Sequence, residues 1–261
     1  MAAPQVACVR FAGSFVVLLV ATRARGLRPR RGNLRPLILR GVLGGTAITC
    51  YYAGIERAGA GLATMLHSTY PVFTALFSVL VLGESFTGRL GAALALNTAG
   101  VAVVLGSPGT VGERVVAGSL VALLGGMLAG GAVATASELR RTESAALVTV
   151  WFMAVGALLT APSFVTGAPA WSASLGLALV GVVLTSAAGQ WLLHHGLGFV
   201  PATVGSLAAA TSVVTAAVLE AMVLGQRLPT RVMAGAVLML AAVGLAGRAH
   251  ASAAADEAVA D

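Results

Sequence analysis

The chain has 261 residues, of which 58% are hydrophobic and only 10% are charged, and its formal net charge at pH 7 is +7. This composition leaves too little polar surface to cover a soluble domain, so soluble enzymes and soluble binding modules are excluded. All of the basic residues are arginines, and most lie between apolar runs. Membrane orientation and anionic lipid head groups therefore explain the positive charge better than nucleic acid does.

Apolar runs of about 20 residues recur along the whole chain, which is the length that a helix needs to cross a hydrocarbon core of roughly 30 Å. Lipid offers the backbone no hydrogen bonds, and these runs are too long for barrel strands. We therefore expect an all-α polytopic membrane protein with about nine transmembrane helices. In chain order the expected spans are Val6–Thr22, Leu37–Ile55, Ala60–Leu82, Leu90–Gly106, Val115–Ser137, Ala145–Thr166, Leu175–Leu193, Ala202–Leu224 and Val232–Ala246.

One long polar connector, RARGLRPRRGNLRP from Arg23 to Pro36, separates the first two expected spans. Cytoplasmic loops of membrane proteins carry an excess of arginine and lysine. We therefore expect a multi-pass protein of the cell membrane with this arginine-rich loop and the C-terminus in the cytoplasm. Residues 249–261 are small, polar and acidic, which predicts a disordered tail.

The sequence contains a weak internal repeat. A shift of 142 residues aligns Ala60–Arg89 with Ala202–Arg231, and eight of the 30 aligned pairs are identical. The copies lie on the third and eighth expected spans, five steps apart, and each step reverses the direction of the chain, so they are expected to be inverted in the membrane. Inverted repeats of broken helices around a site near the midplane are a transporter design. The identical pairs are Ala60/Ala202, Thr69/Thr211, Val72/Val214, Ala75/Ala217, Val81/Val223, Leu82/Leu224, Gly83/Gly225 and Arg89/Arg231.

Three stretches of the sequence carry a resemblance to a known family. HSTYPVFTALFSVLVLGESFTGRLGAALALNTAGVAVVLG, from His67 to Gly106, combines a proline-containing helix, a Leu-Gly-Glu end and a glycine-rich helix. It resembles the EamA-type half of the drug/metabolite transporter superfamily. The segment from Gly189 to Gly247 looks like the second half, and PQVACVRFAG, from Pro4 to Gly13, resembles the start of that family's second helix.

The resemblance implies two repeats, residues 1–110 with four helices and residues 111–248 with five, before the tail. Members of the family usually have ten helices, and the first helix of that pattern is not found in this sequence. Either the true start lies upstream, or this copy lacks that helix and, with it, one wall of the expected cavity. The second copy has Gln226 where the first has Glu84. A role for that carboxylate would thus belong to one half only, and a structural role at the helix end, paired with Arg89, is favoured.

Polar residues inside the expected spans are the candidates for binding a substrate or a proton, because such groups are costly in a bilayer. Glu220 is the clearest candidate, and the alternative is an ion pair with Arg227 or Arg231. His67 lies one turn before Pro71, which predicts a kink beside a titratable side chain. A histidine hydrogen-bonded to a neighbouring helix is the alternative. The weaker candidates are Tyr70, Asn97, Gln190, Tyr51, Tyr52 and Arg10.

We expect no metal and no cofactor. Cys8 and Cys50 are too few for a disulfide framework or a metal site, and the adjacent His194 and His195 cannot both face one ion from a helix. The glycine pairs at 125–126 and 130–131 are expected to be surfaces for close helix packing.

The resemblance implies a secondary transporter, not an enzyme. It would export small metabolites, amino acids or toxic compounds by alternating access, with proton exchange left open. The expected partners are a small-molecule substrate and the lipid bilayer, without nucleic acid, and a homodimer stays open. The main alternative is an integral-membrane enzyme acting on a lipid or isoprenoid. It is disfavoured because the spans contain no acidic pair. A structural scaffold is a third reading.

Overall fold

The computed structural model describes residues 2–23, 27–83, 86–105, 113–164, 172–223, 225 and 230–260, and all regular structure in these residues is helical. The α-helices are α1 (Ala3–Thr22), α2 (Leu34–Ala58), α3 (Ala60–His67), α4 (Tyr70–Phe77), α5 (Gly88–Leu105), α6 (Glu113–Arg140), α7 (Ala145–Thr160), α8 (Ala173–Gly196), α9 (Ala202–Ala210), α10 (Ser212–Val223) and α11 (Thr230–Ala260). A π-helical turn, η1 (Ser78–Leu82), follows α4, and a 3₁₀ turn, η2 (Ala161–Phe164), follows α7.

The helices reproduce the predicted spans, so the all-α polytopic fold class is confirmed. The third span consists of α3, α4 and η1, and the eighth consists of α9 and α10. Six helical segments in the described part of the chain are long and apolar enough to cross a membrane. They are Pro4–Thr22, Ala60–Leu82, Arg114–Arg140, Ala145–Phe164, Ala173–Gly196 and Thr230–Arg248. The other three spans, α2, α5 and α9–α10, pack among these six.

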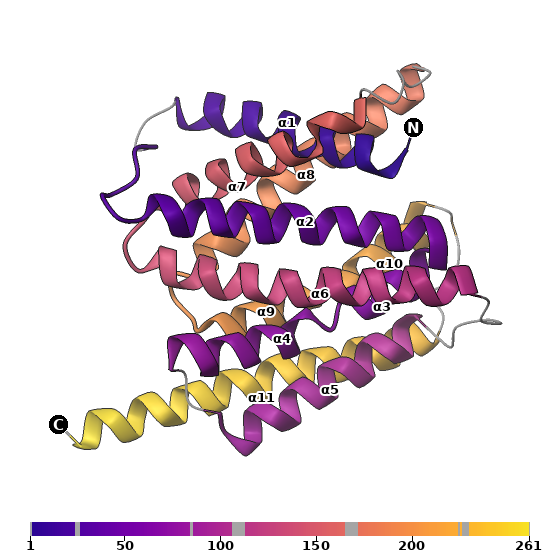
Figure 1. Cartoon of the computed structure of the whole chain (residues 1–261). Helices are drawn as coiled ribbons and strands as arrows, with labels where there is room; N and C mark the ends of the chain where they lie inside the picture. The colour runs from indigo at the N-terminus through magenta and orange to yellow at the C-terminus, as the bar shows by residue number, and fades with distance from the viewer. Residues whose placement is uncertain are drawn as a thin grey trace.

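The helices lie side by side, with α2 and α6 in the middle of the bundle (Figure 1). Helix α2 makes its most extensive contact with α6 and also packs on α7. Helices α1, α7 and α8 form one flank, and the antiparallel pair α5 and α11 forms the other. Helices α3, α4 and α9 lie between this pair and the middle of the bundle, and α10 contacts both α5 and α11.

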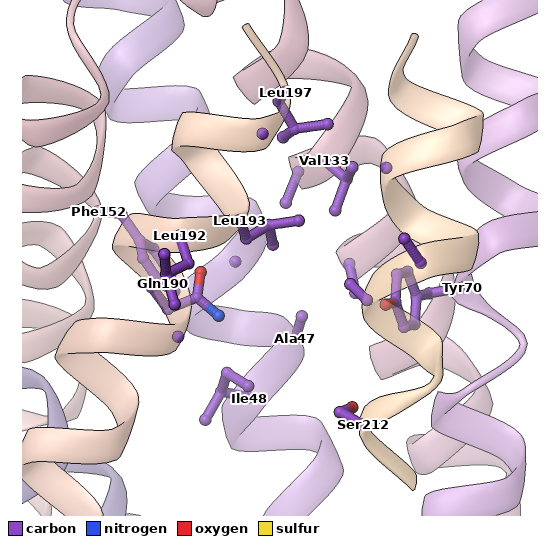
Figure 2. A pocket seen from close by; sticks show the side chains of 18 of the residues that line it. Ala47, Ile48, Tyr70, Val133, Phe152, Gln190, Leu192, Leu193, Leu197 and Ser212 are labelled. Carbon is purple, nitrogen blue, oxygen red and sulfur yellow. The ribbon is translucent and has the colours of Figure 1, made fainter. Parts of the chain in front are cut away.

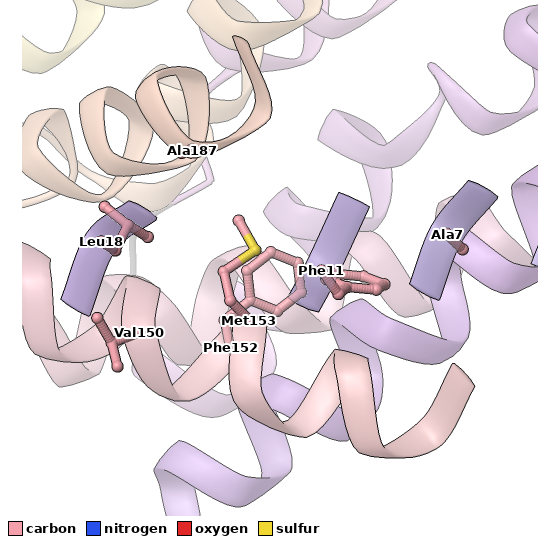
Figure 3. Close-up of a cluster of buried hydrophobic side chains, with 7 residues drawn as sticks. All are labelled: Ala7, Phe11, Leu18, Val150, Phe152, Met153 and Ala187. Atoms are coloured by element: carbon pink, nitrogen blue, oxygen red, sulfur yellow. The ribbon is translucent and has the colours of Figure 1, made fainter. Parts of the chain in front are cut away.

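The flank of α1, α7 and α8 is fixed by an apolar cluster (Figure 3). Its members are Ala7, Phe11 and Leu18 of α1, Val150, Phe152 and Met153 of α7, and Ala187 of α8. The rings of Phe11 and Phe152 meet edge to face, with centroids 5.3 Å apart. This geometry is favourable for aromatic pairs, so it helps to set the orientation of α7, whose Phe152 also faces the interior of the bundle.

Helix α6 packs directly on the backbone of the broken third span through glycines. A Cβ atom on Gly126 would lie 3.0 Å from the carbonyl oxygen of His67. A Cβ atom on Gly130 would lie 2.6 Å from the Cβ of Phe73 and 2.7 Å from the backbone nitrogen of Thr74. A side chain at Gly130 would force α4 to shift, and one at Gly126 would make an unusually tight contact, so these glycines are close-packing positions, as predicted.

The third span is interrupted between His67, where α3 ends, and Tyr70, where α4 begins. At the interruption Thr69 donates twice to the carbonyl of Leu66, from its backbone nitrogen at 3.3 Å and from its hydroxyl at 2.6 Å. Pro71 lies in the first turn of α4, where a missing N–H group leaves no intrahelical hydrogen bond unmade.

The eighth span is interrupted at the equivalent position, Thr211. Thr211 donates to the carbonyl of Ala208 from its backbone nitrogen at 3.2 Å and from its hydroxyl at 2.6 Å. The shift of 142 residues that pairs Thr69 with Thr211 also pairs Pro71 with Val213. The two breaks therefore share a threonine and a hydrogen-bond pattern, whereas only one of them has a proline.

The C-terminal end differs from the expectation. Helix α11 continues to Ala260 and so includes most of residues 249–261, for which the composition predicted disorder. The segment is rich in alanine and has no glycine or proline after Gly247, so nothing in it stops the helix. The predicted division at residues 110 and 111 falls outside the described residues.

Candidate functional site

A cavity of about 600 Å³ lies inside the bundle, between α2 and α6 on one side and α8 to α10 on the other (Figure 2). Residues of both halves line it, and most of the lining is apolar. Apolar lining residues that Figure 2 labels are Ala47, Ile48, Val133, Phe152, Leu192, Leu193 and Leu197. A mainly apolar cavity of this size with a few polar groups is typical of a small-molecule site.

The lining follows the internal repeat. Two lining residues that are 142 positions apart occupy equivalent places in the two halves. Four such pairs line the cavity: Ala47/Gly189, Ile48/Gln190, His67/Ala209 and Tyr70/Ser212. Equivalent positions of the two repeats therefore contribute to the wall of the cavity. In two of the pairs, Ile48/Gln190 and His67/Ala209, only one member has a polar side chain.

Tyr70 joins the two broken spans. Its hydroxyl donates to the backbone carbonyl of Ser206 in α9 at 3.0 Å, and its ring lies at the cavity wall beside Ser212 (Figure 2). The hydroxyl of Thr211, at the second break, donates to the carbonyl of Ala208 in its own span. The breaks thus lie at the cavity, and a side chain from one half contacts the backbone of the other.

His67 also lines the cavity, at the end of α3. Its ring lies against that of Tyr51 with centroids 4.7 Å apart, and its Nδ1 is buried without a hydrogen-bond partner. Tyr51 itself is hydrogen-bonded to Thr64 at 2.8 Å and contacts the ring of Tyr52. His67 is thus a cavity residue, and Tyr51 packs against its ring without lining the cavity itself.

Besides Tyr51, three predicted candidates lie away from the cavity lining. Asn97 is buried in α5, and Tyr52 packs on the cluster of α1, α7 and α8. Arg10 is half-buried in α1, with its guanidinium carbon 5.8 Å from the centre of the Phe11 ring. Glu220 belongs to α10, but its side chain lies outside what the structure describes, and Glu84 lies outside the described residues.

Sequence reasoning missed Arg40, which lines the cavity and is only 3% exposed. It follows the arginines of the connector closely along the chain, so the sequence alone does not distinguish it from them. Its Nη2 donates to the Nε2 of His194 at 3.1 Å and lies 3.5 Å from the Oε1 of Gln190. Gln190 was predicted, and the structure explains its place as a neighbour of this arginine in the cavity wall.

For His194 the sequence excluded a metal site shared with His195 and predicted no other role. It is completely buried, whereas its neighbour His195 is exposed and stacks on Trp191. The two rings point in different directions, as adjacent helical residues must. Within the described residues there is no group of three or more His, Cys, Asp or Glu side chains that could hold a metal ion.

One end of α8 is tied to the turn between α6 and α7. The Nε of Arg140 donates to the backbone carbonyl of His194 at 2.7 Å. The carboxylate of Glu143 in the same turn accepts hydrogen bonds from the backbone nitrogen of Arg30 and from the side chain of Asn33, at 2.7 and 2.8 Å. These contacts connect the arginine-rich connector, the α6–α7 turn and α8 beside the buried His194.

Known proteins agree with this architecture. The model of the EamA-like transporter family matches residues 1–106 and 116–248. The pseudopaline exporter CntI of Pseudomonas aeruginosa, in strains UCBPP-PA14 and PAO1, is 26% identical over 160 residues. That alignment covers 61% of this chain and 56% of the relative, so the matched part is little more than half of the relative's length.

A solved crystal structure shares the fold, with a TM-score of 0.78 at 20% sequence identity. The match covers 94% of this chain and 87% of the other. The likeness at this identity concerns the fold alone. The family match, by contrast, extends over both halves of the chain and includes the helices that line the cavity. The protein therefore belongs to the EamA-like transporter family.

Proposed function

We propose that this protein is a secondary transporter that exports small metabolites or amino acids through the cavity between its two halves. The observation that carries the proposal is a cavity of about 600 Å³ located where two broken helices meet and lined by paired positions of an inverted repeat. Binding sites at the interface of inverted repeats, built from discontinuous helices, are characteristic of secondary transporters. The outward direction rests on the relative named as an exporter.

Alternating access would consist of one half rocking against the other around this cavity. The hydrogen bond from Tyr70 to the Ser206 carbonyl links the two broken spans near the cavity. The breaks at Thr69 and Thr211 give each of these spans a point at which its two parts can change their relative angle. The same bundle could then open first to one side of the membrane and afterwards to the other.

Exchange against protons is part of the proposal. His67 is the candidate that the cavity favours, because it lines the cavity and its buried Nδ1 has no hydrogen-bond partner. Glu220 stays a second candidate from the sequence. The arginine-rich connector and the C-terminus are proposed to face the cytoplasm of the cell, which reporter fusions at the C-terminus would test.

The test is counterflow in proteoliposomes with a panel of labelled amino acids and small metabolites, with and without an imposed pH gradient. The wild type is compared with His67→Gln and with His195→Gln, which is a matched control because His195 is exposed outside the cavity. We expect movement of one class of solute, driven by the gradient in the wild type and in the control but uncoupled from it in His67→Gln.

The outcomes separate the parts of the proposal. Movement that ignores the gradient in all three proteins would refute proton exchange and leave a facilitative transporter. Movement that is equally coupled in His67→Gln would refute the role of His67 and shift attention to Glu220. If no solute of the panel moves in any liposome, transport of metabolites and amino acids is refuted.

A further inference from the structure

Arg40 is a charged side chain in the interior of a membrane-spanning helix. It lies almost two turns inside α2, is 3% exposed and forms part of the cavity wall. An ionised group within a bilayer is costly unless it is paired, and such groups usually contact an opposite charge, backbone carbonyls or a ligand. What compensates this arginine therefore decides what the cavity can hold.

All of the contacts that the structure gives the guanidinium are neutral. They are the Nε2 of His194, the Oε1 of Gln190 and the ring of Phe152, whose centre lies 4.0 Å from the guanidinium carbon. The Nε and Nη1 atoms are buried without a hydrogen-bond partner. Among the described residues that line the cavity there is no aspartate or glutamate.

A chain of hydrogen bonds holds the guanidinium in place. Arginine can only donate, so the Nε2 of His194 accepts and its Nδ1 carries the proton. That Nδ1 donates to the hydroxyl of Thr149 at 2.8 Å, and this hydroxyl donates to the carbonyl of Ala145 at 2.6 Å. The orientation of the arginine is thus determined by groups on α7 and α8.

Helix α2 also leaves space for the guanidinium group of Arg40. A Cβ atom on Gly44, one turn further along α2, would collide with the Nη1 of Arg40. An arginine that only escaped toward the membrane surface would extend away from the bundle. Here the side chain instead lies over Phe152 and against α8, at the wall of the cavity. The arrangement is a preformed site that presents a positive charge at the cavity wall.

We propose that Arg40 binds an anionic group, a carboxylate or a phosphate, on the solute that the cavity accepts. This inference rests on the proposed transport function and specifies its substrate class. The rest of the wall is mainly apolar, with Ile48, Leu192 and Leu193 near Gln190. The solute is accordingly a small organic anion with an apolar body, whose charged end meets Arg40 and Gln190.

The test measures binding to the purified full-length protein in nanodiscs made only of phosphatidylcholine. The probes are N-acetylated amino acids and their primary amides, which match in size and differ in charge. We expect at least one acid to bind roughly tenfold or more tightly than its amide, the difference that a charge-assisted hydrogen bond provides. Arg40→Gln is expected to lose this preference and Arg40→Lys to keep part of it.

Arg35→Gln is the matched control, because it removes the same charge from an exposed position on the same helix. It should keep the full preference for the acid. Equal binding of acids and amides by the wild type would overturn the inference, and this result does not depend on any variant folding. A preference that survives in Arg40→Gln would overturn it as well.

A second set of nanodiscs contains phosphatidylglycerol and distinguishes the solute from a lipid. If this anionic lipid abolishes the preference for acids, Arg40 binds lipid head groups and the assignment to a solute is overturned. Proteoliposomes separate this inference from the function on which it rests. Transport of neutral and anionic solutes with equal efficiency would preserve the transporter and refute the anion site. Acid binding that depends on Arg40, without movement of any solute, would preserve the site and refute transport.

Discussion

Replacing Gly130 with alanine adds one methyl group at the closest approach between α6 and the broken third span. The new Cβ atom would lie 2.6 Å from the Cβ of Phe73 and 2.7 Å from the backbone nitrogen of Thr74. Both are atoms of α4 that no side-chain rotation can displace. The two helices would therefore have to move apart, and with them the break beside the cavity.

Two opposing effects set the magnitude. Alanine in place of a helical glycine stabilises a helix by up to about 1 kcal/mol, whereas overpacking typically costs about 1–3 kcal/mol. Because backbone atoms must shift, we place Gly130→Ala at the upper end of that cost and expect the free energy of unfolding to fall by roughly 1–2 kcal/mol. Gly131→Ala is the matched control, since its Cβ would lie 3.4 Å from the ring of Phe77, an ordinary contact.

The assay is unfolding of the purified protein by titration with sodium dodecyl sulfate in mixed micelles, followed by circular dichroism. Gly131→Ala should be as stable as the wild type or more stable by up to about 1 kcal/mol. Gly130→Ala should unfold at a lower detergent fraction. Equal stability of the two variants would refute the close contact of α6 with α4, and so would a stabilised Gly130→Ala.

The same titration checks three other substitutions. Phe152→Leu keeps an apolar side chain but removes the ring under Arg40 and an aromatic pair, so we expect a loss of about 2–3 kcal/mol. Thr149→Val leaves the buried Nδ1–H of His194 without an acceptor and should cost about 1–3 kcal/mol. Tyr70→Phe removes the donor to the α9 carbonyl, for which we expect a loss of about 0.6–1.7 kcal/mol.

Two of these losses, those of Phe152→Leu and Thr149→Val, have a control that carries the same chemical change elsewhere. Phe199→Leu alters an exposed ring, and Thr135→Val removes a hydroxyl that bonds only to the Gly131 carbonyl of its own helix. Both should change stability by less than the corresponding site variant. A Thr149→Val protein no less stable than Thr135→Val would contradict the hydrogen-bond chain to His194, and an unchanged Tyr70→Phe would contradict the link between the broken spans.

The positions of the spans could be predicted because each depends on local information. A run of about 20 apolar residues must be a helix in lipid, and short polar connections must reverse the chain. The break before Pro71 was signalled by the proline itself. The break at Thr211 has no such signal, and only its alignment with Thr69 across the repeat indicates it.

The polar candidates were harder to sort, because the sequence shows that a polar residue lies in a span but not which way it faces. His67, Tyr70 and Gln190 line the cavity, whereas Asn97 is buried in α5 among neighbouring helices, away from that lining. Nothing local distinguishes these cases. The orientation of a helix about its axis depends on packing against partners that are distant in the sequence.

Arg40 was overlooked for a related reason. Its neighbours along the chain are loop arginines, and its partners Gln190 and His194 are about 150 positions away. Charge counting treats an arginine near a helix end as a determinant of orientation. The burial of this side chain against α7 and α8 becomes visible only when the helices are assembled.

The cavity combines a symmetric scaffold with asymmetric chemistry. The shift of 142 residues that pairs lining positions of the two halves pairs Arg40 with Val182, which carries no charge. In a rocking mechanism a solute held by Arg40 would stay attached to α2 while the other half moves past it. The symmetry of the broken helices would then serve the motion, and the asymmetry of the charge would determine which half carries the solute.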